Sequence, residues 1–118
     1  MGIPASKRLR KKGDFLKVRD QGFRLYCGPF IYQCRLFPAH AESKRRFGVI
    51  ASRRVGNAVT RNKGKRVFRE IFRKNEIQLP ANCDVVIILR SSFRDYSYAE
   101  LEAEFTRACK NAATRIDA

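Results

Sequence analysis

The sequence predicts an α/β two-layer sandwich, an α+β fold in which three helices pack on one sheet of about four strands. Short runs of aromatic and β-branched residues alternate with two longer segments whose apolar residues recur at helical spacing. The run from Cys83 to Leu89 is almost continuously apolar, as in a strand covered on both faces. The expected order is helix, strand, strand, strand, helix, strand, helix. The length of 118 residues suits one domain, residues 1–118, with a single core.

The N-terminal part is expected to be a basic arm followed by a short helix. Residues 1–12 are rich in Lys and Arg, which predicts a mobile arm. Asp14 to Gln21 predicts a helix, because an acidic residue lies in its first turn and Gly22 can end it.

Residues 23–54 are expected to form strands. Residues 23–37 predict two strands, or one bent strand, because the aromatic and β-branched run is broken at Gly28-Pro29. Alternate residues of a strand share a face, and one face here holds Phe30, Tyr32, Cys34 and Leu36. Residues 38–46 are expected to form a polar loop. Residues 47–54 predict a further strand, with Phe47, Val49 and Ala51 on one side.

Residues 58–74 predict an amphipathic helix. Its core stripe consists of Val67, Phe68, Ile71 and Phe72. A separate polar stripe consists of Asn62, Arg66, Arg69 and Arg73. Gly64 points into the apolar arc, where glycine is costly, so close packing against a strand is expected there.

Residues 97–100 form a capping box, Ser97 to Glu100, that predicts the start of the last helix. The apolar stripe of that helix consists of Leu101, Phe105, Ala108, Cys109 and Ala112.

The positive charge is large and uneven. Lys and Arg number 26 and Asp and Glu number 11, so the net charge is +15. Residues 1–19 contain seven basic and one acidic residue, and residues 44–74 contain twelve basic and one acidic residue. A merely solvated surface mixes both signs, so these two segments favour a face that binds a polyanion.

The sequence lacks the signs of a protein catalytic centre or a metal site. It contains no nucleophile elbow and no phosphate loop, and its one histidine, His40, lies in a polar stretch. The four cysteines form no Cys-x-x-Cys pair and are expected to be buried free thiols, so the protein alone is expected to bind no cofactor. No apolar run is long enough to span a membrane, and the start lacks a secretion signal, which favours a cytoplasmic location without a membrane partner.

The most specific segment runs from Arg53 to Glu70 and reads RRVGNAVTRNKGKRVFRE. It resembles the signature of the protein subunit of bacterial ribonuclease P, which is a basic pair, Gly-x-Ala-Val-x-Arg-Asn, Lys-Arg and Arg-Glu at fixed spacing. The matching residues are Arg53, Arg54, Gly56, Ala58, Val59, Arg61, Asn62, Lys65, Arg66, Arg69 and Glu70. The resemblance extends over most of the chain. It departs at Lys63, where the family often has arginine, and at Arg19, where it can have a second aromatic residue.

The resemblance implies a subunit of a ribonucleoprotein endonuclease that hydrolyses one phosphodiester bond in precursor tRNA and so removes the 5′ leader. In this family the RNA subunit and its magnesium ions carry out the reaction, so the chain is expected to assist and to supply no catalytic residue. Its expected partners are ribonuclease P RNA and precursor tRNA, and without RNA it is expected to be monomeric. The family fold also implies a left-handed β-α-β crossover, although general statistics favour a right-handed one.

The resemblance and the charge pattern together give two sets of candidate binding residues. Guanidinium groups at helical spacing suit the phosphates of an RNA groove. The candidates for binding the RNA subunit are Arg54, Asn57, Arg61, Asn62, Lys65, Arg66, Arg69 and Arg73. A single-stranded leader needs aromatic faces and cations, and its candidate residues are Phe15, Lys17, Tyr32, Ser52, Arg53 and Arg90. For Phe15, Tyr32 and also Phe30, packing in the core is the alternative to stacking.

Three other functions fit part of the sequence. A ribosomal or other structural RNA-binding protein would have similar size and charge, and only the Gly56 to Glu70 pattern argues against it. A stand-alone nuclease would need catalytic residues that the sequence lacks. A DNA-binding regulator would be expected to show helix-turn-helix spacing, which is not evident.

Overall fold

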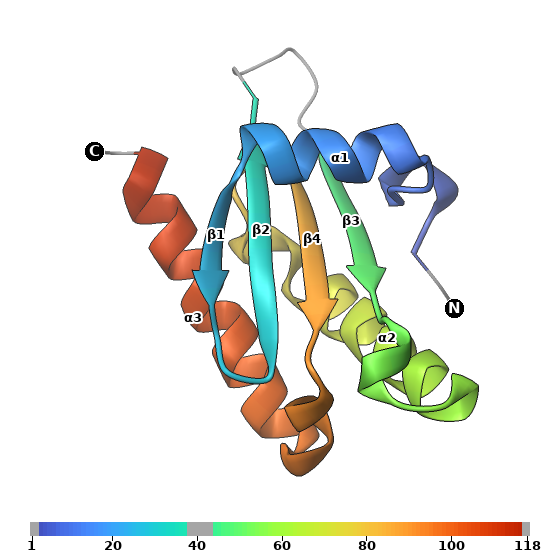
Figure 1. Cartoon of the computed structure of the whole chain (residues 1–118). Coiled ribbons are helices and arrows are strands. Elements are labelled where there is room, and N and C mark those ends of the chain that lie inside the picture. The colour runs from blue at the N-terminus through green and yellow to red at the C-terminus, as the bar shows by residue number, and fades with distance from the viewer. Residues whose placement is uncertain (1–2, 38–43, 117–118) are drawn as a thin grey trace.

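The computed structural model describes residues 3–37 and 44–116 and contains one mixed sheet with the strand order β1-β2-β4-β3 (Figure 1). β2 pairs antiparallel with β1 and β4, and β3 pairs parallel with β4. The strands are β1 (Phe23–Tyr26), β2 (Phe30–Leu36), β3 (Arg45–Ile50) and β4 (Cys83–Leu89). The α-helices are α1 (Lys12–Gln21), α2 (Ala58–Asn75) and α3 (Tyr98–Ile116). The predicted α+β sandwich and its order of elements are confirmed.

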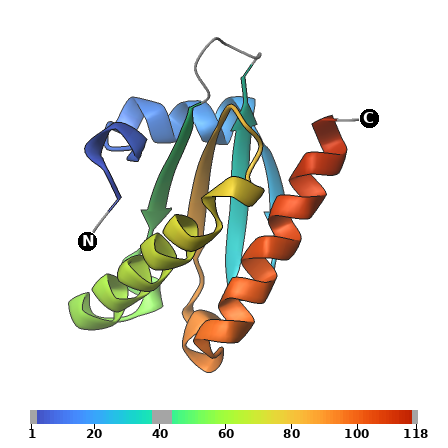
Figure 2. The same cartoon turned by 180° about the vertical axis from the view of Figure 1, so that it is seen from behind.

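The connection from β3 through α2 to β4 is a left-handed crossover, as the family resemblance implies. In Figure 2, α2 lies in front of the sheet, β3 and β4 both point downward, and β4 lies to the right of β3. The chain therefore turns in the opposite sense to nearly all β-α-β units.

The two faces of the sheet are covered unequally. α2 and α3 pack on one face, whereas α1 crosses the other face near one end of the strands (Figures 1 and 2). Because side chains alternate along a strand, Phe30, Tyr32 and Cys34 point together toward α2 and α3, where they are buried in the main core. The second face carries a smaller cluster of Leu9, Val18 and Val86 beside α1. Within the described residues, no helix lies over the other end of that face.

α2 begins at the predicted residue, ends one residue later than predicted, and makes the core contact that the sequence predicts. Asn57 caps it, because the Asn57 side-chain oxygen accepts a hydrogen bond from the Thr60 backbone N–H at 2.9 Å. A Cβ atom at Gly64 would lie 2.6 Å from Leu89 Cδ1 of β4 and 3.0 Å from the ring of Phe93. The expected close approach of Gly64 to a strand is therefore confirmed.

The described part of residues 1–12, the segment expected to be a mobile arm, lies packed against the rest of the domain in the structure. Ile3 and Leu9 are buried, and the Leu9 N–H donates to the Phe47 carbonyl at 2.9 Å. Lys7 also pairs with Glu76 at 2.6 Å. Two apolar side chains among the cations of this segment therefore belong to the core, Ile3 to the main cluster and Leu9 to the smaller cluster beside α1.

The strand predicted at residues 47–54 is shifted toward the N-terminus. β3 begins at Arg45, within the expected loop, because Arg45 and Arg46 pair with the first residues of β4. It ends at Ile50, and a short 3-10 helix, η2 (Arg53–Val55), follows. The buried Val55 anchors this turn beneath the sheet. Residues 38–43 of the expected loop lie outside the described residues.

α3 begins with the predicted capping box. The Ser97 N–H donates to the Glu100 carboxylate at 2.8 Å, and the Glu100 N–H donates to Ser97 Oγ at 3.1 Å. The predicted apolar stripe of this helix is buried against the sheet. Over the described residues, none of the helices combines the length and apolar character that crossing a membrane requires.

Candidate RNA-binding surfaces

A row of four side chains crosses the uncovered end of the sheet, and we call it the open row. In the strand register, Tyr26 lies opposite Ile31, Ile31 opposite Ile88, and Ile88 opposite Ile50. Tyr26 is 69% exposed and Ile50 is 37% exposed, while the two central isoleucines are half-buried. An aromatic and aliphatic strip of this kind offers a contact surface for planar bases.

α1 forms the wall of the open row. Its Phe15 is half-buried, packs like Ile88 against the cluster of Leu9, Val18 and Val86, and has its ring against Gly48 of β3. The next row of the sheet, which contains Val86 and Gly48, is buried beside α1. Phe15 is therefore partly a core residue and remains partly exposed, beside the same small cluster that Ile88 of the open row packs against.

The prediction that Tyr32 stacks on a leader is wrong. Phe30 is not available for stacking either. Both side chains are 0% exposed and lie on the face that α2 and α3 cover. The Tyr32 ring meets the Phe105 ring edge-on at 6.0 Å, and its hydroxyl lies 3.9 Å from Cys109 Sγ. Burial raises the pKa of this hydroxyl well above its usual value. The period of two places Tyr32 with Phe30 and Cys34, and all three are core residues together.

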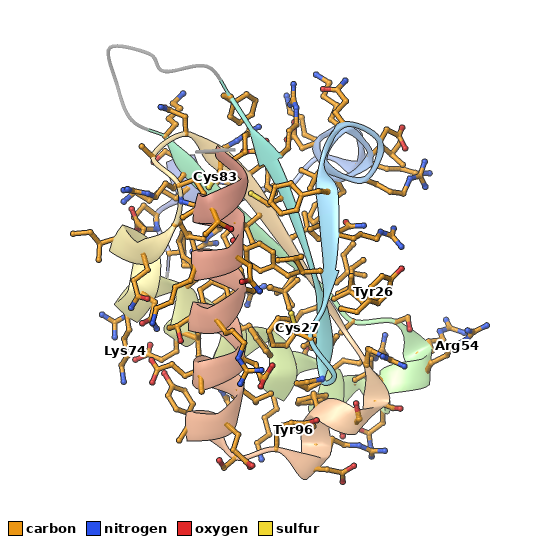
Figure 3. All side chains as sticks on the ribbon, turned by 90° about the vertical axis from the view of Figure 1, so that its left-hand side faces the viewer. Tyr26, Cys27, Arg54, Lys74, Cys83 and Tyr96 are labelled. Carbon is orange, nitrogen blue, oxygen red and sulfur yellow. The ribbon has the colours of Figure 1, made fainter. Side chains whose placement is uncertain are left out.

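The aromatic residue that the sequence reasoning missed is Tyr26. A usable signal was present, because Tyr26 alternates with Leu25 and shares its face of β1 with the exposed Arg24. Figure 3 shows Tyr26 projecting to the side of the sheet on which α1 lies.

Polar and cationic residues lie around the open row. Ser52 and Arg53 follow the end of β3, Arg90 follows the end of β4, and all three are exposed. Lys17 is exposed on α1. Arg54, a candidate for binding the RNA subunit, projects to the same side as Tyr26 in Figure 3. The structure thus places three of the six predicted leader-binding residues, Ser52, Arg53 and Arg90, at the uncovered end of the sheet, while Phe15 and Lys17 lie on α1, which covers the other end.

The polar stripe on α2 is exposed as predicted and forms a second surface. Asn62, Arg66, Arg69 and Arg73 all face solvent. Arg73 is already engaged, since its guanidinium donates to Glu70 at 2.7 Å. This pair raises the pKa of Arg73 and lowers the pKa of Glu70. Arg66 and Arg69 make no ion pair with another described residue, so they are the cations most available to a phosphate.

Three further candidates for the RNA subunit lie beside this stripe. Arg61 and Lys65 are half-buried on its flank. Arg61 Nε is a buried nitrogen without a hydrogen-bond partner among the described residues. Asn57 uses its side-chain oxygen for the helix cap, which leaves its amide NH₂ group to donate elsewhere.

The described part of both surfaces is free of metal-binding clusters. Within residues 3–37 and 44–116, no three His, Cys, Asp or Glu side chains are grouped so as to hold a metal ion. The cysteines of this part of the chain are free, and Cys34, Cys83 and Cys109 are buried. The two surfaces offer cations, hydrogen-bond donors and side-chain faces on which bases can stack.

Comparisons with known proteins all lead to one family. The family model described as Ribonuclease P matches residues 3–113. The ribonuclease P protein component of Shouchella clausii is 34% identical over 106 residues, covering 90% of this chain and 85% of that protein. The solved ribonuclease P protein of Thermotoga maritima has a TM-score of 0.76 at 30% identity, covering 88% of this chain and 96% of that one. The solved ribonuclease P protein of Staphylococcus aureus has a TM-score of 0.76 at 25% identity, covering 90% and 94%.

Proposed function

The chain belongs to the ribonuclease P protein family, and we propose that it binds ribonuclease P RNA and helps to remove the 5′ leader of precursor tRNA. We assign the hydrolysis to the RNA subunit and its magnesium ions. We assign to the protein the binding of the RNA subunit and of precursor tRNA. The proposed location is the cytoplasm, where a bacterial precursor tRNA is made, and the proposed state without RNA is a monomer.

We assign the RNA subunit to the polar stripe of α2. Arg66 and Arg69 are exposed and make no described ion pair, and Asn62 adds hydrogen-bonding groups at the N-terminal end of the stripe. Guanidinium groups donate two parallel hydrogen bonds to a phosphate, which suits them to a folded RNA backbone. Arg61 supports the same assignment, because its buried Nε still lacks an acceptor among the described residues.

We assign the leader to the open row and its rim. A single strand exposes unstacked bases, which bind to aromatic and aliphatic faces, while its phosphates bind to cations alongside. Tyr26 and Phe15 supply ring surface, and Lys17, Arg53 and Arg90 supply charge. The protein would in this way hold the leader while the RNA subunit holds the cleavage site.

One observation carries the proposal: the domain has two chemically different surfaces, a cationic stripe on α2 and an aromatic-aliphatic row on the sheet. A protein that only stabilises a folded RNA needs the first surface and has no use for the second. The second surface therefore favours a substrate with a single-stranded part.

The test is reconstitution with ribonuclease P RNA transcribed from the same genome. We expect the protein to increase the rate of leader removal at low magnesium concentration and to cleave nothing by itself. Failure of the protein to bind this RNA or to change the rate would overturn the proposal. Cleavage by the protein alone would instead favour the stand-alone nuclease.

The ribosomal or structural RNA-binding alternative is tested in the same experiment. A fragment of ribosomal RNA of equal length is added as competitor at increasing concentration. The proposed function requires a clear preference for ribonuclease P RNA, whereas equal competition would favour the alternative.

A further inference from the structure

A groove lies between α2, α3 and the 3-10 helix η4 (Ser91–Asp95), on the side of the sheet away from the open row. Its volume is about 580 Å³, which is within the usual range for sites that hold a small organic group. Buried Phe93 and Leu101 and half-buried Val67 form its apolar part. Val59, which is 77% exposed, lies at its edge. The groove therefore combines an apolar interior with an unusually exposed aliphatic rim.

The rim of the groove carries cations and aromatic rings together. Lys63 and Arg94 line it, and neither makes an ion pair with a described residue. Tyr98 lines it and is 37% exposed, and Lys74 Nζ lies 5.3 Å from the centre of the Tyr98 ring. The part of its lining that the structure describes includes no acidic residue.

Two carboxylates close in sequence to the lining are engaged in other contacts, while Asp95 follows Arg94 in η4 but is not part of the lining. Glu70 pairs with Arg73 and Lys74, and Glu100 closes the capping box at Ser97. The groove thus presents positive charge that is not balanced by its own lining, next to faces on which a base can stack. An anionic aromatic ligand, such as a nucleotide, matches both features.

The groove adjoins the polar stripe of α2. Lys63 follows Asn62 directly in the helix, and Val59 and Arg66 lie about two turns apart on the same exposed side. Figure 3 shows Lys74 on the α2 and α3 side of the molecule, opposite to Tyr26. An RNA that lies along the stripe therefore passes the mouth of the groove, whereas a leader on the open row does not.

We propose that this groove receives one unpaired nucleotide of the ribonuclease P RNA, whose base stacks on Tyr98 and whose phosphate contacts Lys63 or Arg94. The inference rests on the proposed function and deepens it. It gives the RNA subunit a second kind of contact with the protein. One base of the RNA would insert into the groove, next to the place where the polar stripe of α2 contacts RNA phosphates.

Fluorescence gives a direct test because the chain has no tryptophan. Tyr98→Trp places a single tryptophan at the groove, and Ile77→Trp places one at a side chain that is 84% exposed outside both surfaces. Saturation with ribonuclease P RNA should quench the first strongly and the second little. A leader oligonucleotide or mature tRNA alone should quench neither.

Affinity for the RNA subunit gives the second test. Tyr98→Ala should weaken binding about 5- to 100-fold, as expected for loss of one stacked base. Tyr98→Phe keeps the ring and should bind like the wild type, and Ile77→Ala should also leave the affinity unchanged. Chemical probing of the RNA 2′-hydroxyls should find one unpaired nucleotide that the wild type protects and Tyr98→Ala does not.

The outcomes separate this inference from the proposed function. If the wild type does not bind ribonuclease P RNA, the proposed function fails. If the wild type binds and folded Tyr98→Ala binds equally well with the same protection pattern, only the groove assignment is overturned. Quenching of Tyr98→Trp by precursor tRNA alone, or by self-association of the protein without RNA, would also overturn it.

Discussion

The ring of Phe15 lies against the backbone of Gly48, so closely that a Cβ atom on residue 48 would be 2.6 Å from Phe15 Cε1. The same Cβ atom would be 3.2 Å from Leu9 Cβ. Glycine at this position of β3 thus allows α1 to place an aromatic ring directly on the sheet, next to the open row. The ring of Phe15 can occupy this position because residue 48 is glycine and has no side chain there.

Gly48→Ala is expected to lower the free energy of unfolding by about 1–3 kcal/mol, because the added methyl group overpacks the contact with Phe15 and Leu9. Urea denaturation measures this loss. Gly13→Ala is the matched control, since a Cβ atom at Gly13 would have no described atom within 4 Å. The double variant Gly48→Ala with Phe15→Ala should lose less than the sum of the two single losses. Strict additivity would show that the ring does not limit the space.

Tyr26→Ala is expected to weaken binding of precursor tRNA to the reconstituted enzyme by about 1–3 kcal/mol, as for loss of one stacking face. Binding of mature tRNA, which has no leader, should stay unchanged. Phe15→Ala should show the same selectivity. Tyr32→Phe should affect neither RNA, because Tyr32 is buried and its hydroxyl donates its hydrogen bond to Cys109 Sγ inside the core.

The salt dependence of affinity supplies the control for this prediction. Arg90→Ala should reduce the slope of log affinity against log salt by roughly 0.7 for each phosphate that the arginine no longer neutralises, whereas Tyr26→Ala should leave the slope nearly unchanged. Equal weakening for precursor and mature tRNA would remove Tyr26 from the leader surface.

Arg66→Ala is expected to weaken binding of the RNA subunit by about 1–3 kcal/mol with an unchanged melting temperature, because Arg66 is exposed. Arg73→Ala should cost less, since the Arg73 guanidinium is already bound to Glu70. Phe68→Ala should instead destabilise the fold by about 3–5 kcal/mol, because Phe68 is 0% exposed. Filter binding measures the loss of RNA affinity, and thermal unfolding measures the loss of stability. Unchanged RNA affinity of Arg66→Ala at moderate salt would contradict the assignment of the stripe.

Arg46→Ala is expected to cost about 3–5 kcal/mol of stability, because it leaves a buried carboxylate without its partner. Arg46 Nε and Nη2 each donate to Asp84 at 2.8 Å, and the Asp84 side chain is 1% exposed. Adding Asp84→Asn to Arg46→Ala should recover part of the loss, since the amide carries no charge. Chemical denaturation of the three variants measures this, and the absence of recovery would show that the loss came from packing of the arginine stem.

Cys27 is expected to be unreactive at neutral pH, because burial, and next the charge of Glu104, raise the pKa of its thiol to about 11. Only the thiolate reacts with iodoacetamide, so the rate should rise about tenfold for each pH unit between pH 8 and pH 10. Glu104→Gln removes a negative charge, lowers this pKa and should accelerate the reaction at pH 8. Mass spectrometry of the Cys27 peptide follows the rate. A rate that levels off below pH 9 would contradict the raised pKa.

Much of the fold follows from patterns that are local in the sequence. Alternation puts Phe30, Tyr32 and Cys34 on one face, and the capping box marks the start of α3. What alternation does not give is which face becomes covered, because that depends on α2 and α3 packing on the same side of the sheet. The wrong assignment of Tyr32 and the omission of Tyr26 have this one cause.

The other differences between the sequence prediction and the structure occur in segments rich in Lys and Arg, which look like loops in the sequence but are ordered in the structure. Arg45 and Arg46 have the composition of a loop, yet the pairing of Arg46 with Asp84 makes them the start of β3. Ile3 and Leu9 lie among cations and still fix the N-terminal segment to the sheet. The exposed stripe on α2 was predictable because the apolar residues of a long amphipathic helix form one stripe, which packs on the core and leaves the polar stripe in solvent.

The strand order has a consequence for how the chain is made. β4 is the last of the four strands to be synthesised, yet it lies between β2 and β3, so neither of these strands has its inner neighbour until residue 89 has left the ribosome. The β1–β2 hairpin can form early, but a hairpin alone is at best marginally stable in water. Folding of the sheet therefore waits for β4, and until then the nascent chain carries the unpaired edges of β2 and β3 beside a dense run of cations. Such a chain depends on the synthesis of β4 to cover these edges and protect it from aggregation.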